Sequence, residues 1–328
     1  MKIEDLLREQ IIKSDNRSPQ NKQLIKALLE YLANLKDNDI NKRLLGELVS
    51  KYALAEKQLR NLNDELIDKE RRLDLDLKSA AEIQKSLLPQ KSFVVENLEI
   101  AWKFEPCEYM GGDIFNIFQI DSEHLGIYML DVSGHGVPAA MITVSVSQFL
   151  QQNIVHLLKD KQNSLLMAPA QVLNALDKEF PFERFNNFFT ITYVIINTNS
   201  GDTIYSNAGH PYPILLRKNK TMELLNKKGP IIGMGDLNFI DNRKIGFEEG
   251  QLKIKPGDKL FIYTDGIVEY QNHNEEFYGG DRFYRNLKIL KNESVHNIID
   301  QCIRSLMEFG NNTRPQDDIT LLGLELKK

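Results

Sequence analysis

The hydrophobic pattern of this 328-residue chain changes between its first 88 residues and the part that begins near Asn97. The first part contains a single glycine, Gly46, and spaces its apolar residues as one face of a helix. The second part alternates runs rich in Ile, Tyr, Phe and Thr with Gly-containing turns, which is typical of strands. The chain is therefore expected to consist of an N-terminal all-α region followed by a sheet-containing domain.

A heptad pattern in the helical part predicts a coiled coil. The a positions are all apolar: Leu45, Tyr52, Leu59, Leu66, Leu73, Ala80 and Leu87. The d positions are Leu48, Ala55, Leu62, Lys69, Asp76 and Ile83. The charges at Lys69 and Asp76 weaken pairing in the middle of the coil, as expected of a signalling helix that changes its packing. A single long helix that lies on the following domain is the alternative.

These patterns divide the chain into three expected parts. Residues 1–40 form a small helical region for dimerisation or partner binding, residues 41–88 a coiled-coil linker helix, and residues 89–328 the main domain. The predicted strands of the main domain cover residues 98–104, 116–120, 125–130, 188–197, 203–207, 212–217, 259–264 and 319–326. The predicted helices cover residues 137–159, 169–179 and 295–308. Many strands with few, clustered helices predict an α+β fold, a layered β-sandwich flanked by helices.

Composition excludes several classes of protein. The formal net charge of −5 gives no reason to expect a nucleic-acid partner. Cys107 and Cys302 are the only cysteines and lie far apart, which excludes a disulfide scaffold and suits a reducing cytoplasm. No run approaches the roughly 18 apolar residues that a membrane span needs, and the N-terminus lacks the apolar segment of a signal peptide. A cytoplasmic protein without a membrane span is expected.

Several carboxylates lie where predicted strands begin or end. They are Asp113, Asp131, Asp265, Asp317 and Asp318. Glycines beside the first three let the chain turn sharply, so that backbone carbonyls can face the same cation as the carboxylates. All-oxygen ligands select Mg²⁺ or Mn²⁺ over zinc. Because two such ions can activate water and polarise a phosphoryl oxygen, the pattern indicates phosphate-ester hydrolysis without a side-chain nucleophile.

Each of these motifs has a simpler explanation when it is taken alone. A lone Asp-Gly pair is most often only a turn, and the pair Gly111-Gly112 is also compatible with a strand bulge. His135 and His210 are individually more often structural than catalytic. The segment from Gly134 to Gly136 precedes a helix but lacks the rest of a phosphate-binding fingerprint. The order of the motifs along the chain therefore carries the specificity.

That order resembles the SpoIIE/RsbU branch of the PPM metal-dependent protein serine/threonine phosphatases. The motifs are AEIQKSLLPQ, MGGD, LDVSGHGVPAAM, FFTITYVIIN, SNAGHPYPILL, PIIGM, KPGDKLFIYTDGIVEYQN and QDDITLL, which span residues 80–328. The resemblance implies a layered β-sandwich with two Mn²⁺ or Mg²⁺ ions in a cleft between strand ends. It also implies hydrolysis of phosphoserine or phosphothreonine on a protein. Relatives in partner-switching pathways act on a STAS-domain anti-anti-sigma factor, which implies a role in sigma-factor regulation.

The resemblance also implies roles for individual residues. Asp131 bridges the two ions with the Val132 carbonyl beside it, and Asp113 holds the first ion largely through waters, so Asp131 and Asp113 are the expected catalytic residues. Asp265 and Asp317 complete the coordination of the second ion, and Asp317 fits this position better than Asp318. The positions that match family motifs without an assigned role are Asn207, His210 and Glu269. Substrate-binding residues are not indicated.

One departure from the family pattern supports an alternative function. The family usually places an acidic residue three positions after the Asp of GGD, where this chain has Asn116. Loss of a peripheral metal contact favours a pseudophosphatase scaffold that binds phosphoproteins without turnover. A metal-dependent phosphohydrolase of small phosphate esters is a further alternative. Because the principal carboxylates remain, an active protein phosphatase is the preferred interpretation.

The N-terminal helices are expected to form a homodimer that regulates this activity. In the hypothesis, the coiled coil transmits a signal by realigning the predicted helix 137–159, which follows the Asp131 turn. Whether residues 1–40, the coil or both make the dimer is left open.

Overall fold

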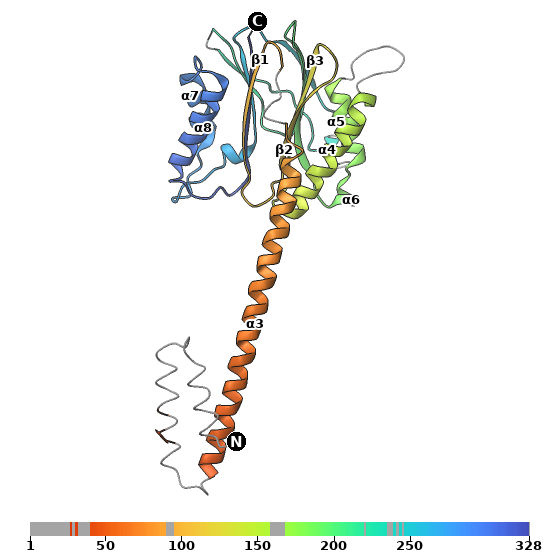
Figure 1. The fold of residues 1–328 in the computed structure, drawn as a ribbon. Coiled ribbons are helices and arrows are strands. Elements are labelled where there is room, and N and C mark those ends of the chain that lie inside the picture. The colour runs from red at the N-terminus through yellow and green to blue at the C-terminus, as the bar shows by residue number, and fades with distance from the viewer. Residues whose placement is uncertain are drawn as a thin grey trace. The chain divides into compact units, whose positions relative to one another are not determined.

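The computed structural model describes residues 27, 30–31, 40–89, 95–157, 168–219, 221–234, 239–240, 243–244 and 246–327. Internal contacts divide the chain into two units, Met1–Asp76 and Leu77–Lys328. Helix α3 (Ile40–Lys85) begins in the first unit and ends in the second (Figure 1). The predicted linker segment 41–88 is therefore helical as far as Lys85, and its pairing as a coiled coil stays a prediction. The predicted helical region 1–40 lies almost entirely outside the described residues. No helix in the described part of the chain has the length and apolar character of a membrane span.

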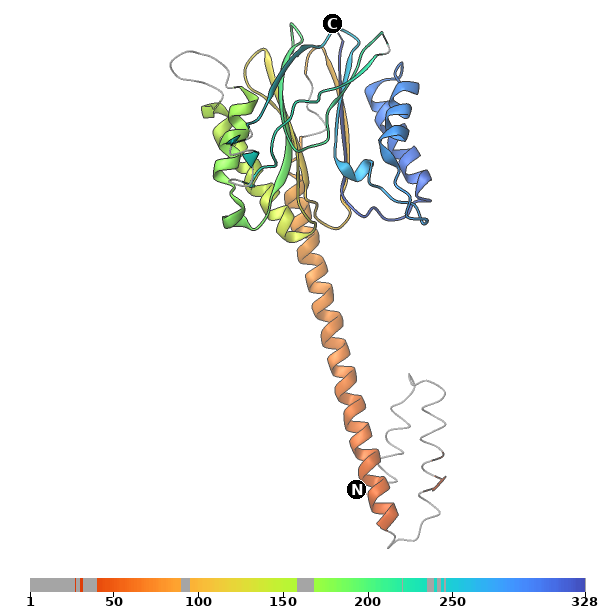
Figure 2. The ribbon, with the colours of Figure 1, turned by 180° about the vertical axis from the view of Figure 1, so that it is seen from behind.

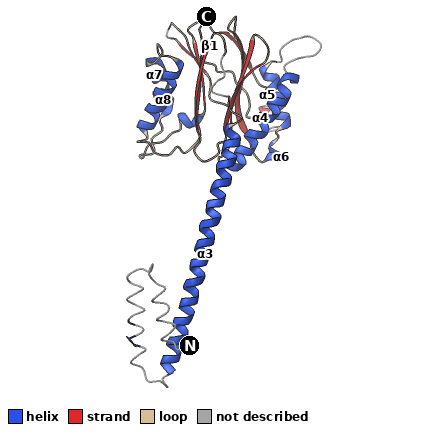
Figure 3. Cartoon of the chain, viewed as in Figure 1, coloured by secondary structure: helices blue, strands red, loops and turns tan. Residues whose placement is uncertain are grey.

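The second unit contains two five-stranded antiparallel sheets (Figure 3). The first sheet has the order β1 (Leu98–Glu105), β12 (Ile319–Leu326), β11 (Lys259–Tyr263), β6 (Ile214–Leu216) and β7 (Met222–Leu224). The second sheet has the order β10 (Glu249–Lys253), β5 (Asp202–Ala208), β4 (Phe189–Asn197), β3 (His124–Val132) and β2 (Asp113–Gln119). A separate short ribbon pairs β8 (Phe239–Ile240) with β9 (Arg243–Lys244).

Helices cover the outer face of each sheet (Figures 1 and 2). The second sheet is covered by α4 (Val137–Leu157) and α5 (Pro169–Glu179), with the short α6 (Phe182–Phe185) beside them. The first sheet is covered by α7 (Gly279–Ile289) and α8 (Val295–Phe309). A single 3₁₀ turn, η2 (Asp265–Ile267), follows β11. The predicted α+β layered sandwich is therefore confirmed, as are all eight predicted strands and the three predicted helices within a few residues.

The two-residue period of the strands separates an inner core from the two outer ones. On β3, Ile127 and Met129 belong to the core between the sheets, whereas Tyr128 and Leu130 pack beneath the helices. The same alternation on the other strands fills the space between the sheets with aliphatic and aromatic side chains. At one end of this space the inward-facing positions become polar: Asp113, Asp131, Thr190, Asn207, Thr264, Asp318 and Thr320. This polar end is where a site can form.

Candidate metal centre

Asp113 and Asp131 are direct cross-strand neighbours at the polar end of the sandwich. Asp113 begins β2, Asp131 lies near the end of β3, and the two residues pair in the antiparallel register. Both lie at even spacing from the strand residues that fill the inner core, so their carboxylates lie on the same face of the sheet, toward the other sheet. Two carboxylates placed side by side repel each other, and such an arrangement requires compensation by a cation or a proton.

Asp113 is fixed by hydroxyl groups from the opposite sheet. Its side chain is 2% exposed, and its Oδ2 accepts hydrogen bonds from Thr264 Oγ1 at 2.8 Å and Thr320 Oγ1 at 2.5 Å. Thr264 follows β11 and Thr320 lies in β12, so these bonds join the two sheets beside the carboxylate pair. Burial, followed by the charges of Asp131 and Asp318, raises the pKa of Asp113 well above its usual value.

Asp318 is buried and its carboxylate binds backbone N–H groups, whereas its neighbour Asp317 is exposed to solvent. The Asp318 carboxylate accepts hydrogen bonds from the backbone N–H groups of Cys107 at 2.8 Å, Gly112 at 2.5 Å and Asp113 at 3.3 Å. A Cβ atom at Gly111 would lie 2.5 Å from Asp318 Oδ2, which explains why glycine is needed in this turn. Asp318 therefore holds the turn that carries Asp113.

The carboxylates from separate strand ends are close enough to change one another's ionisation. Burial raises the pKa of Asp131 to about 8, with further contributions from Asp265, Asp317 and Asp318. Burial, then Asp317 and Glu269, raises the pKa of Asp265 to about 6. The mutual repulsion that raises these values is what a divalent cation relieves, and carboxylate oxygens are the ligands that Mg²⁺ and Mn²⁺ prefer. The donor set therefore fits hard divalent ions.

The turn after Asp131 brings backbone oxygens close to the turn that carries Asp113. Gly134 and Gly136 adopt positive φ angles of 86° and 77°, which glycine reaches without strain. A Cβ atom at Gly112 would lie 2.8 Å from the Val132 oxygen and 2.9 Å from the Gly134 oxygen. Both carbonyls thus lie against the Gly111-Gly112 turn, directly before Asp113. The assignment of the Val132 carbonyl as a metal ligand stays a prediction.

A cluster of Cys107, Asp317 and Asp318 could also hold a metal ion, since their ligand atoms lie within 4.8 Å of one another. Burial, and then the charge of Asp318, raises the pKa of the Cys107 thiol to about 12. A thiol binds metal as the thiolate, which is disfavoured here. Asp318 already accepts three backbone hydrogen bonds. The oxygen donors around Asp131 are therefore the better candidate for metal binding.

Gln84, which the sequence analysis did not single out, connects the end of α3 to this centre. The side chain is 3% exposed, and its Nε2 donates to the Gly111 carbonyl at 2.6 Å and to Thr143 Oγ1 on α4 at 3.1 Å. Its Oε1 accepts the Gly111 N–H at 3.1 Å. The motif AEIQKSLLPQ signals this segment, but a glutamine in the last turn of a polar helix looks like an exposed residue.

The comparisons with known proteins agree with this geometry. The family described as Stage II sporulation protein E (SpoIIE) matches residues 121–327, more than half of the chain. The chain belongs to the SpoIIE family. The family assignment made from the motif order is thereby confirmed.

Two relatives of this SpoIIE-family chain are phosphoserine phosphatases of Bacillus subtilis. The chain is 29% identical to RsbP over 199 residues, which are 59% of this chain and 45% of RsbP. It is 25% identical to RsbU over 288 residues, which are 86% of this chain and 78% of RsbU. The chain thus spans less than half the length of RsbP.

A solved structure shares the fold of the SpoIIE-family domain. The SiaA PP2C domain of Pseudomonas aeruginosa superimposes with a TM-score of 0.63 at 19% identity, covering 78% of this chain and 98% of that domain. This likeness shows that the fold is that of PP2C domains.

Asn116, which replaces the acidic residue usual in the family, lies away from the carboxylates of the site. Asn116 lies on the same face of β2 as Ile114, which packs in the core beneath the helices. Asp113 lies on the opposite face, which belongs to the core between the sheets. The Asn116 side chain interacts with Tyr128 and accepts the N–H of Ile117 at 2.8 Å. Asn116 therefore does not replace a carboxylate in this cluster. His135 is exposed and pairs with Glu108 at 3.0 Å, and it also acts electrostatically on Asp317, so it lies on the solvent side of the carboxylates.

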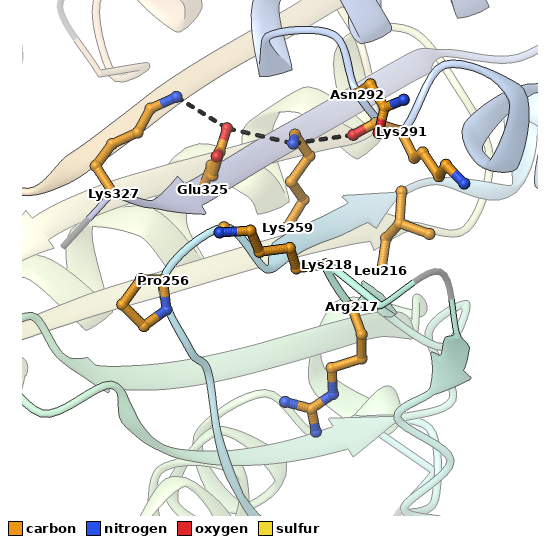
Figure 4. Close-up of a pocket in the computed structure, with 10 residues that line it drawn as sticks. Leu216, Arg217, Lys218, Pro256, Lys259, Lys291, Asn292, Glu325 and Lys327 are labelled. Carbon is orange, nitrogen blue, oxygen red and sulfur yellow. Dashed lines mark hydrogen bonds and ion pairs between the residues drawn. The ribbon is translucent and has the colours of Figure 1, made fainter.

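A polar pocket of about 290 Å³ lies at the ends of β11 and β12 that are opposite to the carboxylates (Figure 4). Lys259 there donates to the Lys291 carbonyl at 3.1 Å and pairs with Glu325 at 3.4 Å. Lys327 also pairs with Glu325, at 2.9 Å, and Arg217 pairs with Glu223 and Asp258. These basic groups are largely neutralised by neighbouring carboxylates, so the pocket is an ion-pair network and the candidate site stays at the acidic end.

Proposed function

We propose that the chain is a metal-dependent protein serine/threonine phosphatase that hydrolyses phosphoserine or phosphothreonine on a regulatory protein. The observation that carries the proposal is the convergence of Asp113, Asp131, Asp265 and Asp317 at one end of a PP2C sandwich. Membership of the SpoIIE family and similarity to two phosphoserine phosphatases support the phosphoprotein substrate.

The metal ligands in this proposal are Asp113, Asp131, the Val132 carbonyl, Asp265 and Asp317. Two bound Mn²⁺ or Mg²⁺ ions would supply a water nucleophile at neutral pH and neutralise charge on the phosphoryl group. The charge of Asp131 interacts with Asp113, Asp265 and Asp317, so in this proposal Asp131 would help to hold both ions. Thr264 and Thr320 hold Asp113 in one orientation, and Asp318 holds the turn before it. Asp318 thus has a supporting role in place of a ligand role.

A STAS-domain anti-anti-sigma factor in a partner-switching pathway is the proposed substrate. The phosphoserine phosphatase activity of RsbP and RsbU supports the phosphoserine part of this proposal. The STAS-domain part follows from the motif resemblance.

We also propose that two copies of the chain pair through the heptad face of α3. Leu48, Leu59, Leu66 and Leu73 on this face are 62%, 70%, 57% and 59% exposed in the single chain. A row of exposed leucines at a and d spacing is the sequence requirement of a coiled coil, and a second copy would bury it. The contacts of Gln84 with Gly111 and Thr143 give the end of this helix a direct connection to the candidate metal centre and to α4.

The substrate class distinguishes this function from its alternatives. Phosphate release is measured with Mn²⁺ on a phosphoserine peptide, an aryl phosphate and a nucleotide. We expect turnover of the phosphopeptide and the aryl phosphate. Turnover of the nucleotide alone would indicate a small-ester phosphohydrolase, and binding of the phosphopeptide without any turnover would indicate a pseudophosphatase.

A further inference from the structure

A buried threonine–histidine pair extends the row of site residues along the second sheet. Thr190 on β4 pairs with Asp131 on β3, so the two side chains lie on the same face. Thr190 Oγ1 lies 2.8 Å from Nδ1 of His210, which is 3% exposed. The row Asp113, Asp131, Thr190 thus crosses three strands and ends against an imidazole.

The turn that carries His210 is fixed by Asn207. The N–H of His210 donates to Asn207 Oδ1 at 3.0 Å, and Asn207 Nδ2 donates to the His210 carbonyl at 2.9 Å and to Thr192 Oγ1 at 2.9 Å. Gly209 between them has a φ of 68°, which allows the tight turn. These bonds explain why Asn207 and His210 occur together in the motif SNAGHP.

The surroundings of the ring assign its proton. Burial lowers the pKa of His210 to about 3, so the imidazole is neutral and carries one N–H. The backbone of Tyr263 acts on the ring in the direction that raises its pKa, which is the effect expected of a carbonyl oxygen beside a ring N–H. Because Nδ1 faces Thr190, Nε2 is the nitrogen left to face the Tyr263 backbone, although no hydrogen bond to Nε2 forms in the described structure. We assign the proton to Nε2 on this ground. Nδ1 is then an acceptor, and the Thr190 hydroxyl must donate to it.

A hydroxyl whose hydrogen is committed to a neighbour can only accept further hydrogen bonds. We propose that Thr190 is a positioning residue that accepts a hydrogen bond from the nucleophilic water beside Asp131, and that His210 holds the hydroxyl in this accepting orientation. The proposal rests on the proposed phosphatase function. A water that donates to Thr190 keeps an oxygen lone pair for phosphorus.

In the reaction, the water oxygen forms the new bond to phosphorus and the bond from phosphorus to the seryl or threonyl oxygen breaks. One proton of the water ends on that oxygen. Thr190 neither gains nor loses a proton, because it orients the water through its lone pairs.

The test compares Thr190→Val, which keeps the shape but removes the acceptor, with Thr190→Ser, which keeps the acceptor. We expect Thr190→Val to lower kcat for a phosphoserine peptide roughly 10- to 100-fold, with KM and Mn²⁺ affinity changed less than about twofold. Thr190→Ser should stay close to wild type. Thermal melts establish that the variants fold, and Thr190→Ala replaces Thr190→Val if the latter does not.

A second readout does not depend on activity. In the metal-free protein, ¹⁵N NMR of His210 should show a protonated Nε2 and an unprotonated Nδ1. A proton on Nδ1, or wild-type kcat in folded Thr190→Val, would overturn the proposal while leaving the phosphatase function intact. A wild-type protein without Mn²⁺-dependent phosphatase activity would overturn the proposed function, and this proposal with it.

Discussion

Asp317 and Asp318 are adjacent in the chain, but their carboxylates differ in what they contact. Asp318 is buried and accepts three backbone N–H groups, whereas Asp317 is exposed beside the carboxylate cluster. The motif QDDITLL places both residues just before a strand and cannot distinguish them. The register of β12 does so, because it turns Asp318 toward the turn that carries Asp113.

Substitution of each aspartate by asparagine separates the two roles. We expect Asp318→Asn to lower the free energy of unfolding by about 1–3 kcal/mol, because an amide accepts backbone hydrogen bonds less strongly than a carboxylate. Asp317→Asn should leave thermal stability unchanged or slightly raised and weaken Mn²⁺ binding in a calorimetric titration. The reverse pattern would show that Asp318 is the ligand.

The raised pKa values of Asp131 and Asp265 predict a pH dependence of stability in the metal-free protein. A carboxyl group with a raised pKa binds its proton more strongly in the folded state than in the unfolded state. The protein therefore becomes less stable as this group ionises. The free energy of unfolding should therefore fall as pH rises from about 4 to about 8, by up to about 1.4 kcal/mol per pH unit for each proton.

Chemical denaturation at several pH values measures this slope. Asp131→Asn should flatten it, and saturating Mn²⁺ should abolish it because the cation compensates the same charges. A metal-free stability that rises steadily between pH 5 and pH 8 would contradict the described electrostatics.

At the scale of elements, the sequence predicted those strands and helices whose hydrophobic pattern is strong. β12, with the sequence ITLLGLEL, buries residues on both faces and is evident as an apolar run. Helix α7 was not predicted, because it begins with two glycines and buries only Phe283 and Leu287. β10 was also missed, because it is an edge strand of sequence EGQLK with one fully buried residue. Weakly buried elements leave little periodicity in a sequence.

The carboxylates of the candidate site could be predicted from the sequence, but the groups that hold them in place could not. Acidic residues at strand ends beside glycines are visible in the sequence. Thr264, Thr320 and Gln84 are not, because only the pairing of β11 with β12 and the packing of α3 bring them to Asp113 and Gly111. Contacts that depend on tertiary register have no local sequence signal.

Two charged residues interrupt the apolar heptad face of α3, and they are predicted to weaken the pairing of two such helices. Lys69 and Asp76 occupy d positions, where a buried charge opposes association. We expect Lys69→Leu combined with Asp76→Leu to stabilise the dimer and to fix phosphatase activity in one state. Light scattering and turnover numbers measure both effects.

The control for this pair is Arg72→Leu with Asp68→Leu, which changes an exposed i,i+4 ion pair outside the a and d columns of the same helix. Unchanged dimerisation and regulation in the Lys69/Asp76 double variant would contradict the role proposed for the coil.

For the whole molecule, the division of the chain predicts which fragment behaves as a phosphatase. Residues 77–328 form one compact unit that includes Gln84, and Ala81 packs there with Met110 and Ala140. We expect residues 77–328 to be a folded, Mn²⁺-binding monomer. Residues 90–328, which lack Gln84, should bind Mn²⁺ more weakly or be less stable.

Size and activity measured together on these fragments and on the full chain test this division. A full-length dimer whose activity differs from that of residues 77–328 would show that the N-terminal part regulates. A monomeric full-length protein, or equal Mn²⁺ affinity and stability in the two fragments, would contradict the boundaries and contacts inferred above.

In the proposed function, Asp131 organises a two-metal phosphatase site. The most direct measurement is Mn²⁺-dependent phosphate release from a phosphoserine peptide by wild-type protein and by Asp131→Asn. We predict that chelation abolishes wild-type turnover, that Mn²⁺ restores it, and that folded Asp131→Asn loses it roughly 10³-fold or more at saturating Mn²⁺. Turnover in Asp131→Asn equal to that of the wild type, or wild-type turnover unaffected by metal removal, would contradict this role of Asp131.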